Sequence, residues 1–198
     1  MKINRAEFFK KYRENFNPEL TRQQVSGYDA IFDYWESSPL NDLRWLAYAL
    51  ATAYHETGKI MYPVREGFCS TDAGAIQAVT KLFEKGKIQR NYAIPHLNNG
   101  NSYYGRGLVQ ITHGDNYSRI GNIIGHPLFE KPDLALNLII SVKIMFVGMS
   151  DGLFTGKRFR DYFTDTKTDW LGARRIINGT DKKELIADYA KKFFACLS

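Results

Sequence analysis

The chain has 198 residues, of which 44% are hydrophobic and 24% charged, a balance that is typical of one folded domain and excludes a disordered chain. No run approaches the roughly 20 apolar residues that a membrane helix needs, so membrane insertion is not expected. The net charge of +6 favours anionic partners, but the basic residues are spread along the chain, so a basic solvated surface explains the charge equally well and nucleic-acid binding is not expected.

The first 40 residues predict two helices. Asn4 and Glu7 have the spacing of a capping box, and aromatic residues follow on one side. Thr21 and Gln24 repeat the device before a second amphipathic stretch. This segment carries no motif that points to a function, and we expect it to pack as helices against the core or to act as a separate binding segment.

Residues 41–198 predict mostly helices. Asn41 or Asp42 can cap a third helix, whose apolar residues recur at helical spacing until Gly58 ends it. Pro63 and Gly67 interrupt residues 60–70, which predicts a short extended piece or hairpin. Further helices are expected at about 71–85, 113–125, 133–149, 169–177 and 181–196.

Glu56 directly follows the apolar third helix and therefore stands at a helix end anchored in the core. A carboxyl group in a partly apolar cleft has the raised pKa that a general acid requires at neutral pH. Taken alone, however, the position of Glu56 is better explained by a solvated glutamate at a helix end. His55 lacks the HExxH spacing of a zinc site, so no metal is expected.

Glu66 lies ten residues after Glu56, which on an unbroken helix would separate them by about 15 Å. Because Gly58 and Pro63 break the helix, the chain can fold back and place the two carboxylates across a groove. Carboxyl groups roughly 6.5–9.5 Å apart, with water between them, are the arrangement of an inverting glycosidase. The alternative is a surface glutamate paired with Arg65 or with a lysine.

The block from Tyr103 to Thr112 combines glycines, which permit close approach of a ligand, with tyrosines, whose faces and hydroxyls suit sugars. Neutral hydrogen-bonding side chains follow at Gln110, Thr112 and Asn116. The glycine spacing is not that of a dinucleotide site, and no phosphate-loop lysine follows. Asn178 stands at a later helix end. Taken alone, the block from Tyr103 to Thr112 is equally explained by a structural turn, and Asn178 is better explained by an ordinary C-terminal helix cap.

Taken in order, these motifs resemble glycoside hydrolase family 19, which contains chitinases and many phage endolysins. The resemblance spans about residues 43–195 and is most specific in its central block. It implies a mainly α, lysozyme-like α+β fold with a small irregular or β region beside an active-site cleft, and one catalytic domain over residues 1–198. The matching motifs are His55–Gly58, Tyr103–Thr112 with Asn116 and Tyr117, and Ile177–Gly179.

The resemblance also implies roles for individual residues in cleaving β-1,4 bonds between aminosugars with inversion. By position, Glu56 matches the general acid, and Glu66 matches the general base in the shorter spacing of compact phage-type members. Thr112 matches the hydroxyl residue that helps to hold the attacking water. Further substrate contacts are expected at Tyr104, Gln110, Asn116 and Asn178.

The chain departs from the family pattern at several points. Lys59 stands where a second glycine usually follows the acid, and Leu108 stands where a proline is usual. The cysteine framework of the plant chitinases is missing. The spacing from Glu56 to Glu66 is also much shorter than in the plant enzymes, which makes the assignment of Glu66 depend on the fold.

Small size, basic charge and compact motif spacing favour a peptidoglycan hydrolase of the phage or prophage endolysin type. A chitinase, with the same chemistry on an unbranched aminosugar polymer, is the alternative. A glycan-binding protein without turnover is a third possibility, against which the presence of both carboxylates argues.

No cofactor is expected. The expected partner is the polysaccharide substrate, and we expect the protein to act as a monomer. The two cysteines, Cys69 and Cys196, lack metal-site spacing and are expected to be reduced thiols. The charged N-terminal residues lack the apolar stretch of a signal peptide. We therefore expect a protein that is made in the cytoplasm and acts on the cell wall after release.

Overall fold

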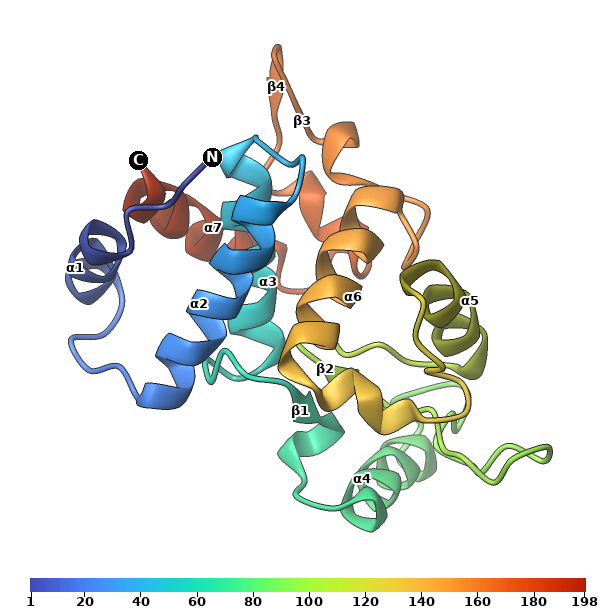
Figure 1. Cartoon of the computed structure of the whole chain (residues 1–198). Coiled ribbons are helices and arrows are strands. Elements are labelled where there is room, and N and C mark those ends of the chain that lie inside the picture. The colour runs from blue at the N-terminus through green and yellow to red at the C-terminus, as the bar shows by residue number, and fades with distance from the viewer.

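The computed structural model describes all 198 residues, with seven α-helices and four very short strands (Figure 1). This confirms the mainly α prediction. Two antiparallel pairs, β1–β2 and β3–β4, contain all the strands. The helices are α1 (Arg5–Asn15), α2 (Arg22–Ser37), α3 (Leu43–Glu56), α4 (Asp72–Glu84), α5 (Gly114–Ile124), α6 (Leu138–Asp151) and α7 (Lys183–Leu197). The strands are β1 (Val64–Arg65), β2 (Arg106–Gly107), β3 (Phe163–Thr164) and β4 (Lys167–Thr168).

Local capping signals set the starts of the first three helices. Thr21 and Gln24 form both halves of a capping box before α2, as expected. The Asn4 side chain accepts from the backbone N–H of Glu7, but the return bond is not formed. Asp42, and not Asn41, caps α3. In each case a side-chain oxygen satisfies a first-turn N–H that has no partner within the helix.

Two expected helices differ in the structure. The helix expected at 133–149 is split, because the Asn137 side chain accepts from the backbone N–H of Ile139 and of Ile140 and so starts α6 anew. A 3₁₀ helix, Pro132–Leu136, precedes it. The segment expected at 169–177 is also a 3₁₀ helix, Gly172–Ile176, and the β3–β4 hairpin before it was not expected.

The helical body is built around α3, which lies behind α2 in Figure 1 and packs against α7. Its residues from Leu46 to Tyr54 are all buried. The N-terminal helices join the same hydrophobic cluster of 39 buried residues, for example where the rings of Phe8 and Phe193 stack 6.4 Å apart. The segment without a recognised motif therefore packs against the rest of the fold. None of the helices is both long and apolar enough to cross a membrane.

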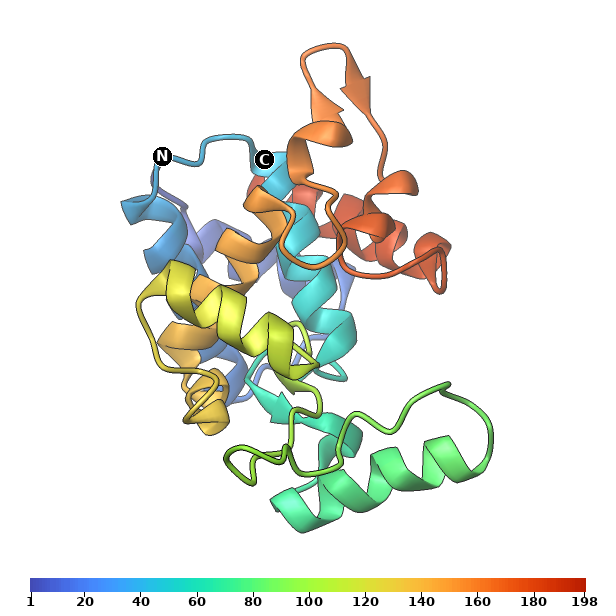
Figure 2. The same cartoon turned by 90° about the vertical axis from the view of Figure 1, so that its right-hand side faces the viewer.

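A small lobe, formed by α4 and the loop after it, stands apart from the helical body. Figure 2 shows α4 and the loop after it below the other helices. The lobe has its own hydrophobic cluster, formed by Ala75, Val79, Ala93 and Tyr104. The β1–β2 pair, with Arg65 opposite Arg106, forms the link between lobe and body.

The turn that connects α3 to β1 rests on α2. The side-chain amide of Gln24 donates to the carbonyl of Lys59 (3.0 Å), and the N–H of Met61 donates to the hydroxyl of Thr57 (3.0 Å). A Cβ atom at Gly27 would lie 1.7 Å from the carbonyl oxygen of Met61. Glycine at this position therefore allows α2 and the turn to come into contact.

Replacing Gly27 by alanine tests this contact. Alanine is the better helix former by about 1 kcal/mol, yet we expect Gly27→Ala to lower the free energy of unfolding by about 1–3 kcal/mol, as overpacking does. Thermal and urea unfolding would measure it. Ser26→Ala, at the neighbouring exposed position of α2, is the control and should change stability by no more than about 0.5 kcal/mol. A Gly27→Ala protein as stable as the wild type would contradict the close packing.

Candidate active site

A cleft of about 500 Å³ brings together six of the seven residues singled out in the sequence. Its walls come from the helical body on one side and from the segment after β1 and the small lobe on the other. The six are Glu56, Glu66, Gln110, Thr112, Asn116 and Asn178.

Glu56 is the last residue of α3 and forms a buried ion pair with Arg174. Nη1 of Arg174 lies 2.9 Å from Oε1 of Glu56, and the two side chains are only 4% and 18% exposed. Nε of Arg174 donates to the carbonyl of Asp181, which fixes the guanidinium. Oε2 of Glu56 has no hydrogen-bond partner in the protein. One carboxylate oxygen is thus held in place while the other remains available to a ligand.

His55 precedes this carboxylate in the chain and is half-buried. Burial lowers the pKa of His55 below its usual value, although the neighbouring Glu56 carboxylate acts in the opposite direction. No group of three or more His, Cys, Asp or Glu side chains is arranged to bind a metal ion.

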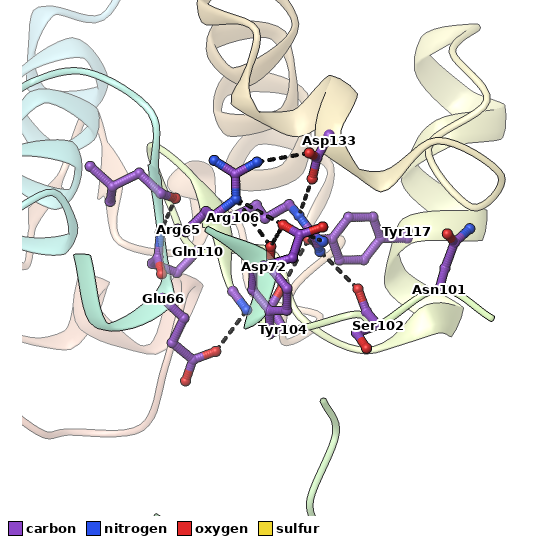
Figure 3. Close-up of polar contacts among 12 residues, drawn as sticks. Arg65, Glu66, Asp72, Asn101, Ser102, Tyr104, Arg106, Gln110, Tyr117 and Asp133 are labelled. Atoms are coloured by element: carbon purple, nitrogen blue, oxygen red, sulfur yellow. Dashed lines mark hydrogen bonds and ion pairs between the residues drawn. The ribbon is translucent and has the colours of Figure 1, made fainter. Parts of the chain in front are cut away.

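Glu66 follows β1 directly, so the pairing of β1 with β2 sets it opposite Gly105. The backbone N–H of Glu66 donates to the carbonyl of Gly105, and the N–H of Gly105 donates to Oε2 of Glu66, both at 2.7 Å (Figure 3). The Tyr92 hydroxyl donates to Oε1 at 2.5 Å. Burial and this hydrogen bond raise the pKa of Tyr92, so its hydroxyl keeps the proton that it donates. Each carboxylate oxygen still has a lone pair for a water molecule.

Gly105 allows two cleft side chains to approach the backbone closely, as the glycines of this block were expected to allow. A Cβ atom there would lie 2.8 Å from Oε1 of Gln110 and 3.1 Å from Oε2 of Glu66. The Gln110 amide nitrogen in turn donates to the carbonyls of Val64 (3.1 Å) and Gly107 (3.0 Å). Gln110 therefore braces β1 against the end of β2, and its own oxygen lies near the cleft.

The remaining predicted residues of the cleft, Thr112, Asn116 and Asn178, offer neutral polar groups. The Asn116 side chain donates to the carbonyl of Thr112 (2.9 Å) and accepts from Arg119 (3.0 Å). The Thr112 hydroxyl is left without a partner in the protein, and the exposed Asn178 side chain accepts only from the N–H of Gly179. These groups can bind hydroxyl and acetamido groups without adding charge.

Tyr104 is the residue that the structure does not bring to the cleft. Its side chain is fully buried in the small lobe. Its ring covers the guanidinium of Arg106 at 3.6 Å, and its hydroxyl donates to Asp72. The expected substrate contact at Tyr104 is therefore replaced by a position in the polar network beneath the cleft.

This network connects lobe and body through Arg106, which is almost completely buried (Figure 3). Its Nε lies 2.8 Å from Asp133, and its Nη1 donates to the carbonyl of Ser102 at 2.9 Å. Arg65, across the strand pair, also contacts Asp133 (2.8 Å) and Asp72 (2.9 Å). Burial raises the pKa of Asp72, but hydrogen bonds from its neighbours outweigh this and lower it.

Two residues of the cleft were missed in the sequence. Phe68, whose side chain is 59% exposed, lines the cleft and lies so close to Gly58 that a Cβ there would be 2.9 Å from its ring. Its position two residues after Glu66 could have suggested an aromatic platform for a sugar. Tyr92 lies 26 residues after Glu66 in a loop without a motif, so no sequence signal could have paired them.

Comparisons with known proteins identify the family and the fold of this chain. Residues 46–150 match the family model for glycoside hydrolase family 19, described as chitinase class I. No curated protein matches the sequence closely enough to be called a relative. Among solved structures, chitinase C from Streptomyces griseus HUT6037 is 18% identical with a TM-score of 0.56, over 98% of this chain and 76% of that one. A bacterial family 19 chitinase is 21% identical with a TM-score of 0.57, over 99% of this chain and 95% of that one.

At these identities the solved structures show that the fold is shared. The family match covers more than half of the chain and includes α3 with Glu56, the β1–β2 pair and the segment from Tyr103 to Asn116. The chain belongs to glycoside hydrolase family 19.

Proposed function

We propose that this glycoside hydrolase cleaves the β-1,4 bonds between aminosugars of bacterial peptidoglycan, with inversion at the anomeric carbon. The observation that carries the proposal is that Glu56, from the helical body, and Glu66, beside the small lobe, line one cleft and are held in different ways. In this proposal the whole chain is one catalytic domain that acts as a monomer on the wall after release.

Glu56 is the general acid. Arg174 holds its Oε1, so Oε2 is the oxygen through which the proton passes to the leaving glycosidic oxygen. The pairing sets the orientation of the carboxyl group before the substrate binds, which is what proton transfer in the transition state requires.

Glu66 is the general base. The two donors on its carboxylate, the Tyr92 hydroxyl and the Gly105 N–H, fix its plane. It takes a proton from a water molecule that the free Thr112 hydroxyl helps to hold. The water attacks the anomeric carbon on the face opposite the leaving group, so the first product is the α-anomer.

The neutral side chains of the cleft suit an aminosugar chain of either polymer. Gln110, Asn116 and Asn178 can bind hydroxyl and N-acetyl groups, and the exposed ring of Phe68 can stack on a sugar face. The cleft therefore supports the sugar backbone and does not by itself choose between chitin and peptidoglycan.

Charge favours peptidoglycan. Chitin is uncharged, whereas bacterial envelopes carry carboxylates and phosphates that attract a chain of net charge +6. Chitin is the second candidate, because the family description and the solved structures above are those of chitinases.

Glu56→Gln keeps the size of the side chain and a contact to Arg174 but removes the transferable proton. We expect activity on cell walls to fall by about 10²–10⁴-fold with folding retained. Clearing of a peptidoglycan suspension, with circular dichroism as the check on folding, would measure it. Glu14→Gln, at an exposed position of α1, should retain full activity. A Glu56→Gln protein with more than a tenth of wild-type activity would rule out the assignment.

Tyr92→Phe removes one donor from Glu66 and leaves the ring in place. We expect kcat to fall by about tenfold, because one hydrogen bond to a charged group is lost, while KM stays close to that of the wild type. Initial rates on a soluble aminosugar oligomer would separate the two constants. Tyr34→Phe, whose hydroxyl has no partner in the protein, is the control. An unchanged kcat would show that Glu66 does not depend on Tyr92.

The dependence of activity on salt concentration should distinguish peptidoglycan from chitin as the substrate. Raising it from 0.01 M to 0.1 M shortens the Debye length from about 30 Å to about 10 Å, so clearing of cell walls should weaken. Cleavage of short soluble oligomers should barely change, because the substrate-binding groups of the cleft are neutral. Turbidity assays across a salt series, beside an assay of chitin release, would measure both. Efficient chitin release without effect on cell walls would leave the chitinase candidate standing.

A further inference from the structure

A second groove of about 690 Å³ lies beside the cleft and shares Tyr92 and His113 with it. Its other walls come from the end of α4 and from the loop at residues 89–98, and Tyr103 and Gly114 also line it. Because the two hollows share a wall, a branch on a glycan chain bound in the cleft can reach the groove.

The walls of this groove are anchored to the fold. The Asn91 side chain donates to the Thr80 hydroxyl on α4 (3.1 Å). At the far end of the loop, the Asn101 side chain donates to the carbonyls of Phe129 (3.1 Å) and Glu130 (3.0 Å) in the helical body. The groove is therefore a shaped surface held from both sides.

Three apolar side chains line the groove and face solvent. Phe83 is 44% exposed, Ile94 is 63% exposed and Leu97 is fully exposed. Exposed aliphatic and aromatic groups gathered in a hollow are typical of a binding surface. They suit a ligand with small aliphatic groups better than a polymer of phosphates.

The segment from the end of α4 to the start of the following loop, which borders the groove, is basic. Residues 81–90 contain four lysines or arginines and one glutamate, and none of these residues forms an ion pair. Arg90 lines the groove, as does Asp115, whose side chain is also unpaired. The surface thus favours a ligand with more carboxylates than amines.

We propose that this groove binds the short acidic peptide that branches from the peptidoglycan glycan, while the glycan itself occupies the cleft. The inference rests on the function proposed above and names the part of the substrate that chitin lacks. A stem peptide has backbone amides, small aliphatic side chains and several carboxylates, which match the apolar walls and Arg90. A neutral sugar would leave Arg90 without a partner.

Direct binding tests the groove without any need for catalysis. The ¹⁵N-labelled full chain, carrying Glu56→Gln to prevent turnover, is titrated with a soluble disaccharide–tetrapeptide from peptidoglycan and with the same disaccharide without peptide. We expect the peptide-bearing probe alone to shift the amide signals of Ile94 and Leu97. Identical shifts with both probes, or none in the groove, would overturn the assignment.

Matched variants separate the groove from overall charge. Leu97→Asp and Arg90→Gln should each weaken binding of the peptide-bearing probe by about tenfold, the effect of one charged contact. Ile139→Asp, at a position 64% exposed on α6, and Lys191→Gln, at an exposed position of α7 outside the groove, make the same changes of charge and should leave binding unchanged. An equal loss in the controls would assign the effect to general attraction by anionic polymers and refute the groove.

Kinetics distinguish the failure of this inference from the failure of the proposed function. The wild type should cleave peptide-bearing glycan about tenfold more efficiently than glycan stripped of its peptides, and Leu97→Asp should reduce that ratio to near one. Equal cleavage of both glycans would refute the groove and leave the function standing. Cleavage of neither glycan would refute the function, and the titration would still decide whether the groove binds the peptide.

Discussion

The buried guanidinium of Arg106 organises the region beneath the cleft. A buried charge costs several kcal/mol unless it is paired and hydrogen-bonded, and here Asp133, the carbonyl of Ser102 and the ring of Tyr104 surround it. Burial alone would lower its pKa, but the neighbouring hydroxyls and carboxylate raise it, so the group stays charged. Because Asp133 also contacts Arg65, the same interaction fixes both strands of the β1–β2 pair.

The two carboxylates of the cleft depend on different parts of this frame. Glu56 ends a helix whose buried residues form the centre of the hydrophobic core, so packing sets its position and Arg174 its orientation. Glu66 follows a strand of only two residues, so its position depends on the polar network and on the hydrogen bonds to Gly105 and Tyr92. Core substitutions should therefore disturb the position of Glu56 first, and changes in the network should disturb that of Glu66.

In the proposals above, the cleft binds the glycan and the neighbouring groove distinguishes the polymer. The predicted substrate-binding groups of the cleft are neutral, whereas a run of unpaired cations and three exposed apolar side chains lies on the small lobe beside it. The proposed preference for peptidoglycan thus depends on α4 and its following loop and not on the carboxylates.

The sequence by itself determined the helix starts at Thr21 and Asp42, the position of Glu56 at a helix end and the glycine at 105, because capping, periodicity and backbone freedom act within a few residues. It misplaced Tyr104 and missed Tyr92, and it could not reveal that Arg174 pairs with Glu56. The partners in these contacts are 32, 26 and 118 residues apart. Only packing of the helical body against the small lobe decides such contacts, since no local pattern specifies which distant side chain fills a buried position.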